Sequence, residues 1–146
     1  MKTDDYLKIG VVLLAILQPI LILIFLGDIP SISMSWGTVL QPVFILTNAS
    51  TSFYFFSTKQ WRIQALLLMF LTAFSTNMFE TVHNIIAISF FIACFFSMSR
   101  DRYSRYFYLI AIPTYLLYNI FWAEFVAIAV LCFYHLRLLL KVNRVI

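Results

Sequence analysis

Charged residues are scarce in this sequence. Asp, Glu, Lys and Arg make up 11% of its 146 residues, whereas soluble domains contain about 25%. The chain therefore lacks the polar surface that a water-facing globule needs. This scarcity excludes a soluble enzyme and a disordered protein, and the length corresponds to about one domain.

Cysteines and basic runs are also scarce. Cys94 and Cys132 both lie in apolar stretches, with neither the spacing of a metal site nor the pattern of a secreted disulfide scaffold. We therefore expect two buried free thiols. The net charge is +4, but the bases form no run of the kind that follows phosphates, so no nucleic-acid partner is expected.

Apolar residues dominate the remaining composition. Hydrophobic residues make up 63% of the chain, and the mean hydropathy is +0.95. These values predict an integral membrane protein with short loops. A helix needs about 20 residues to cross about 30 Å of hydrocarbon. The first apolar stretch is long enough and has no cleavage site after it, so we interpret it as a retained anchor rather than a signal peptide.

Two of the apolar stretches are too long for one crossing. A single helix over residues 63–98 would measure about 54 Å, and residues 106–140 form a stretch of similar length. We expect the first to turn back near 77–84 and the second near 119–124. The sequence thus predicts an all-α, polytopic membrane bundle, a single transmembrane domain over 1–146, with six helices in three hairpins. Five spans are the alternative, because the fifth is short and contains Pro113. The expected spans are 9–27, 39–57, 62–79, 83–99, 105–120 and 122–140.

The basic residues follow this topology. With six spans, every lysine and arginine falls on the side that holds both termini, and the positive-inside rule places that side in the cytoplasm. The residues concerned are Lys2, Lys8, Lys59, Arg62, Arg100, Arg102, Arg105, Arg137, Lys141 and Arg144.

Polar side chains gather at the opposite, outward ends of the predicted spans. Polar groups are costly in hydrocarbon and usually face a bundle interior, a cavity or the interface. We therefore predict a polar pocket that opens toward the outer leaflet. The alternative is that the same side chains cap helix ends at the headgroup level. The predicted ligand-binding residues are Asp28, Ser31, Ser33, Asn77, Glu80, His83 and Glu124.

Glu80 and His83 have the Glu-x-x-His spacing that occurs in di-metal bundles. Such a site needs more carboxylates and a second motif, so we predict no metal and no other cofactor. A hydrogen bond from His83 to Glu80 or Glu124 is the expected use of the motif. No nucleophile motif surrounds Ser31 or Ser33, and no catalytic residue is predicted.

Two further polar residues are interpreted from their depth. His135, near the basic end of the last span, is expected at the membrane interface. Asn48 begins a glycosylation sequon but lies inside the second span, where no transferase reaches, so we interpret the match as chance.

Two segments of the chain, residues 29–33 and residues 77–91, are similar to segments of a known family. The first resembles the Pro-x-Ile-Ser loop of the Frag/DRAM/Sfk-type membrane proteins. The second is similar to that family's turn from the third to the fourth span, although Asn84 stands where the family commonly has Asp. The resemblance implies six spans, cytoplasmic termini and a role in lipid-anchor remodelling, phospholipid distribution or autophagy control, without an agreed catalytic triad. It marks as a lipid-headgroup pocket the residues Pro30, Ser31, Ser33, Asn77, His83 and Glu124.

Three functions remain open from the sequence. We favour a non-enzymatic protein that binds or organises membrane lipid through the outward pocket, because one histidine and two carboxylates are a small set for catalysis. One alternative is a lipid-modifying enzyme with His83 as base. The other is an oligomeric channel or membrane effector, acting as a homo-oligomer or with a protein partner at the cytoplasmic basic loops. A transporter is disfavoured because the charges stop at the outer third of the spans.

Overall fold

The fold is all-α, as predicted. The computed structural model describes residues 3–98 and 101–142, and these contain no strand. Lys2, Arg100 and Arg144 lie outside the described residues. The helices are α1 (Thr3–Phe25), α2 (Gln41–Phe56), α3 (Arg62–Ala73), α4 (Thr76–Ser97), α5 (Arg102–Tyr108), α6 (Ala111–Leu117) and α7 (Ile120–Val142), with short 3-10 helices η1 (Ile32–Gly37) and η2 (Lys59–Trp61).

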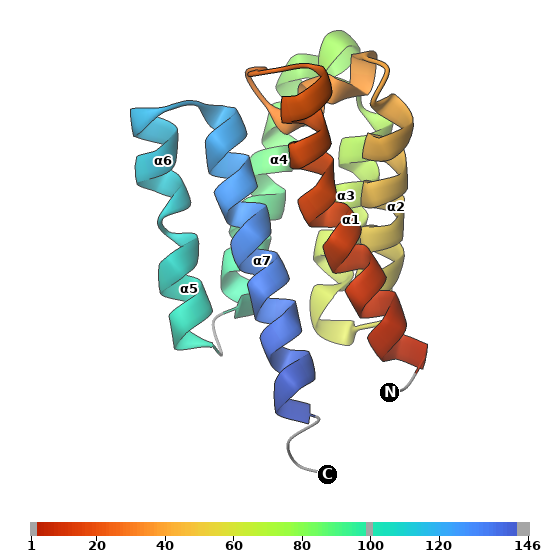
Figure 1. The fold of residues 1–146 in the computed structure, drawn as a ribbon, viewed down its shortest axis with the longest axis vertical. Helices are drawn as coiled ribbons and strands as arrows, with labels where there is room; N and C mark the ends of the chain where they lie inside the picture. The colour runs from red at the N-terminus through yellow and green to blue at the C-terminus, as the bar shows by residue number, and fades with distance from the viewer. Residues whose placement is uncertain (1–2, 99–100, 143–146) are drawn as a thin grey trace.

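The helices form three hairpins side by side (Figure 1). α1 pairs with α2, α3 with α4, and the consecutive helices α5 and α6 together pair with α7. α1 begins and α7 ends at the same end of the bundle, which we call the termini end. The other end holds residues 26–40, 74–75 and 118–119, and we call it the loop end.

Local sequence explains where several helices stop. Gly27 has a positive φ of 73°, a conformation that glycine adopts without strain, and it redirects the chain after α1. Pro42 lies in the first turn of α2, where its missing N–H costs no hydrogen bond. Pro113 cannot donate to the carbonyl four residues earlier. The predicted span 105–120 is accordingly two short helices that are separated at Leu109 and Ile110.

The turn after α3 lies earlier than the sequence predicts. The chain reverses at Phe74 and Ser75, both in extended conformation, rather than within 77–84. The polar residues that suggested a turn belong instead to the beginning of α4. Phe79 has non-helical torsions there (φ −137°, ψ 47°) and kinks the helix.

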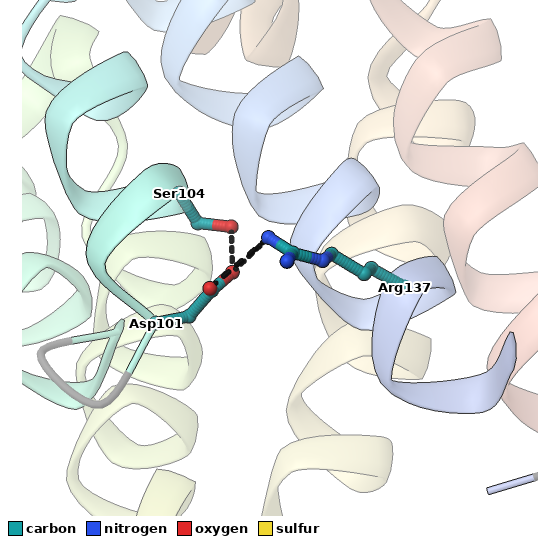
Figure 2. Close-up of polar contacts among 3 residues, drawn as sticks. All are labelled: Asp101, Ser104 and Arg137. Atoms are coloured by element: carbon teal, nitrogen blue, oxygen red, sulfur yellow. Dashed lines mark hydrogen bonds and ion pairs between the residues drawn. The ribbon is translucent and has the colours of Figure 1, made fainter. Parts of the chain in front are cut away.

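An ion pair holds α5 against α7 at the termini end (Figure 2). The Arg137 guanidinium on α7 lies 3.1 Å from each carboxylate oxygen of Asp101. Asp101 also accepts a 2.5 Å hydrogen bond from the Ser104 hydroxyl. Because Asp101 immediately precedes α5, this network fixes where that helix starts beside α7.

The outward faces of the bundle are strongly apolar. Large side chains such as Leu13, Phe53, Ile63 and Leu116 are each more than 60% exposed. Among the described residues, three helical segments are long and apolar enough to cross a membrane: Asp5–Phe25, Thr76–Ser97 and Ile120–Leu140. The prediction had six such segments. α2 and α3 are shorter, about 24 Å and 18 Å at 1.5 Å per residue.

Candidate functional site

The loop between α1 and α2 is held against α7 by backbone groups. The Ile32 N–H donates a 2.6 Å hydrogen bond to the Glu124 carboxylate. The Phe121 N–H donates to the Pro30 carbonyl at 3.0 Å. Two contacts of this kind fix η1 over the first turns of α7, so that Glu124 and the loop serines belong to one rigid structure.

Two serines of this loop form a buried pair. The hydroxyls of Ser31 and Ser33 are 3.0 Å apart and bonded to each other, and both residues are buried. Each hydroxyl has two acceptor lone pairs but only one proton. The pair therefore retains acceptor capacity for a further group.

His83 on α4 is buried with one ring nitrogen bonded. Its Nδ1 lies 2.6 Å from the Phe74 carbonyl oxygen. A carbonyl can only accept, so Nδ1 carries a proton, and in the neutral form of the ring Nε2 is an acceptor. Nε2 is buried and has no hydrogen-bond partner among the described residues. An unpartnered buried acceptor favours the approach of a donor group.

These four residues share one end of a large lateral cleft. The cleft has a volume of about 760 Å³ and lies between α4 on one side and α5, α6 and α7 on the other. It exists because α4 packs chiefly on α3 and η1 rather than on the last hairpin. Ser31, Ser33, His83 and Glu124 line its polar end. Apolar side chains line the rest, among them Ile88, Phe91, Ile92, Phe95 and Ile112.

Three of the predicted site residues lie outside the cleft. Asp28 is exposed, and its carboxylate accepts a long 3.4 Å hydrogen bond from the Asn119 amide. Asn77 is exposed and its amide lies against Gly37, where a Cβ would clash. Glu80 is exposed on α4. The structure thus brings together four of the seven predicted residues.

The expected hydrogen bond from His83 to Glu80 or Glu124 is absent among the described residues. His83 bonds to the Phe74 carbonyl and Glu124 to the Ile32 N–H. That prediction is wrong because backbone groups at helix ends, which have no partner within their own helix, take these side chains as hydrogen-bond partners instead. Within residues 3–98 and 101–142, no group of three His, Cys, Asp or Glu is placed to hold a metal.

His135 is buried between aromatic rings. The residue is 5% exposed and packs between the rings of Tyr54, Phe55, Trp61 and Tyr134. It therefore lies inside the bundle, while its depth at the membrane interface stays a prediction. Asn48 is buried as well.

Sequence reasoning missed a row of polar side chains inside the bundle. Gln18, Thr47 and Asn48 are all buried, and with His135 they line a smaller central cavity. The available signal was their position in the middle of apolar stretches, where a polar residue is uncommon. Charge counting alone could not detect it, since only His135 is ionisable.

No protein-family model, no curated protein and no solved structure matches this chain. The resemblance to the Frag/DRAM/Sfk-type proteins accordingly stays a prediction. A functional proposal therefore depends on the cleft itself.

Proposed function

We propose that this protein crosses the membrane six times and binds one membrane lipid in the lateral cleft, without chemical turnover. The headgroup lies at the end formed by Ser31, Ser33, His83 and Glu124. The acyl chain lies along α4. The observation that carries this proposal is a large, mainly apolar cleft whose serines, histidine and carboxylate all lie at one end.

Six crossings are supported by the distribution of charge. Lys8, Lys59, Arg62, Arg105 and Arg137 all belong to the termini end of their helices. The exposed apolar faces extend over the short helices as well as the long ones, as Phe53 and Ile63 illustrate. A short helix is accommodated when the bilayer thins locally or its flanking residues reach the interface.

The dimensions of the cleft suit a single chain in one leaflet. His83 and Phe96 both line it, and thirteen helical positions correspond to about 20 Å. One leaflet of hydrocarbon is about 15 Å deep. The volume is within the range of sites that enclose a small ligand. A chain that starts at His83 can therefore lie in the cleft over its whole leaflet depth.

The polar end favours a headgroup that donates hydrogen bonds. Glu124 and the Nε2 atom of His83 are acceptors, and the two serines have acceptor capacity left. A carboxylate repels a phosphate placed directly against it. An ammonium such as that of phosphatidylethanolamine offers three donors and a complementary charge, whereas the trimethylated ammonium of phosphatidylcholine offers none.

This difference gives a direct test. The protein is purified in detergent, mixed with phosphatidylethanolamine or phosphatidylcholine of identical acyl chains, and examined by native mass spectrometry. We expect a one-to-one adduct that forms more readily with phosphatidylethanolamine. The preference should be lost in Glu124→Gln and retained in Glu80→Gln, a matched change at an exposed carboxylate. Equal adducts with both lipids in every variant would contradict the proposal.

A further inference from the structure

The central cavity adjoins the lateral cleft but lies mainly between other helices, and the two share Ser33, Ala87, Phe91 and Glu124. It has a volume of about 90 Å³ and is enclosed mainly by α1, α2 and α7. Four buried polar atoms on its walls have no hydrogen-bond partner among the described residues. They are Gln18 Nε2, Thr47 Oγ1, Asn48 Nδ2 and His135 Nε2.

Four unpaired polar atoms in one cavity indicate that it is hydrated. A buried donor or acceptor without a partner destabilises the fold. Buried waters commonly satisfy such groups, and one water needs a cavity of roughly 10–15 Å³ and two to four polar partners. A cavity of about 90 Å³ is large enough for several. The polar atoms come from three helices, so waters between them can bond to one another.

The cavity extends along the bundle axis between two ionisable residues. Glu124 and His135 both line it, and eleven positions on α7 correspond to about 16 Å. Gln18 on α1 and Asn48 on α2 belong to the middle of their helices, between these two levels. The polar groups are therefore distributed along the length of the cavity rather than gathered at one point.

Further polar side chains lie at both ends of the cavity. At the loop end, Ser33 and Glu124 line the cavity and the open cleft alike. At the termini end, the Nδ1 atom of His135 lies 3.1 Å from the Tyr54 hydroxyl. The half-buried Lys8 ammonium lies 5.9 Å from the centroid of the Tyr54 ring. Among the described residues, the titratable side chains beside His135 are Lys8 on α1, Tyr54 on α2 and Tyr134 on α7 itself.

We propose that the central cavity holds a file of water molecules that conducts protons between Glu124 and His135. A proton enters at the Glu124 carboxylate and passes along the waters as O–H bonds form and break in sequence. It binds to His135 Nε2, the imidazolium releases its Nδ1 proton to the Tyr54 hydroxyl oxygen, and the Tyr54 O–H proton passes to water at the termini end. The proton gradient drives the transfer, and no other reactant is needed. This activity does not depend on lipid in the cleft.

The two native cysteines test hydration without altering the cavity. Cys132 lines the cavity and its thiol donates weakly to the Val12 carbonyl at 3.8 Å. Cys94 is fully buried and lines neither the cavity nor the cleft. After transfer to D₂O, infrared spectroscopy follows the conversion of S–H to S–D, with Cys94→Ala and Cys132→Ala to assign the bands. We expect Cys132 to exchange much faster than Cys94. Equal, slow exchange would show a dry cavity and overturn the proposal.

Proton flux tests the activity itself. The protein is reconstituted into vesicles that contain a pH-sensitive dye, and a potassium gradient with valinomycin drives proton entry. We expect flux above that of empty vesicles, lost in Gln18→Leu and His135→Phe. It should persist in Gln64→Leu, which removes a buried amide outside the cavity. A hydrated cavity without flux, or flux that the cavity variants leave unchanged, would refute proton conduction while leaving lipid binding untouched.

Discussion

The backbone N–H of Ile32 and the carboxylate of Glu124 are joined by a 2.6 Å hydrogen bond across 92 positions of sequence. The bond connects the loop-end helix η1 to α7. It also holds the carboxylate where the lateral cleft and the central cavity meet, because Glu124 lines both. The shape of the polar end therefore depends on this contact.

Replacing Glu124 should separate its structural role from its charge. Glu124→Ala leaves the Ile32 N–H without its acceptor and should lower the free energy of unfolding by about 1–3 kcal/mol. Glu124→Gln keeps an acceptor oxygen and should cost less. Unfolding by SDS titration in mixed micelles measures both. If the two variants lose equal stability, the hydrogen bond to Ile32 is not what Glu124 contributes.

Two amide variants of His83 should distinguish the roles of its two ring nitrogens. The Asn amide can occupy the position of Nδ1 and keep the hydrogen bond to Phe74, but it has no group at the position of Nε2. The Gln amide reaches the position of Nε2 instead. We therefore expect His83→Asn to keep stability and lose the preference for phosphatidylethanolamine. His83→Gln should lose stability and keep part of the preference. The same response in both variants would contradict the assignment of Nε2 as the headgroup acceptor.

Filling the cleft should reduce lipid binding without damage to the core. Ile112 on α6 lines the cleft and is 59% exposed, so Ile112→Trp adds volume there at little packing cost. Ile63 is 66% exposed and does not line the cleft, which makes Ile63→Trp the matched control. We expect the native mass spectrum to lose the lipid adduct only in Ile112→Trp. Retention of the adduct in both variants would place the lipid elsewhere.

The ion pair of Arg137 and Asp101 should stabilise the last hairpin. The two side chains point toward each other (Figure 2) and are partly buried, and hydrogen bonds to charged groups contribute about 1.5–3 kcal/mol. Arg137→Ala should lower the free energy of unfolding by about that amount. Arg62→Ala, at an exposed arginine of the same end, should have almost no effect. In the Arg137→Ala background, Asp101→Ala should lower the free energy of unfolding only a little further. If the two single losses of stability instead add in full, the ion pair does not stabilise the hairpin.

The sequence predicts how far along the bundle axis a residue lies better than it predicts which way its side chain faces. Apolar run lengths and the positions of the bases predict the order of the hairpins, the shared end of both termini and the all-α class. They also place Ser31, Ser33, His83 and Glu124 at one level. They do not fix the rotation of α4 about its axis, so the sequence predicts Glu80 in the pocket although its side chain is exposed.

The remaining differences arise from backbone groups and from packing. The torsions of Phe79 and the turn at Ser75 depend on how α3 meets α4, which no local pattern in 77–84 reveals. The partners of His83 and Glu124 are a carbonyl and an N–H that helix ends leave free. The burial of His135 results from three aromatic neighbours on other helices, Tyr54, Phe55 and Trp61. Such contacts follow from tertiary structure alone.

The place where a bound lipid touches the protein decides whether the lateral cleft is a lipid site. Phosphatidylethanolamine with a photoreactive diazirine in its acyl chain is reconstituted with the protein in bilayers, irradiated and located by peptide mass spectrometry. We expect labelling concentrated on α4 and α6, at residues such as Ile88, Ile92 and Ile112, and its loss in Ile112→Trp. Labelling spread evenly over the exposed faces of α1, α2 and α3, and unchanged in that variant, would contradict a lipid site in the cleft.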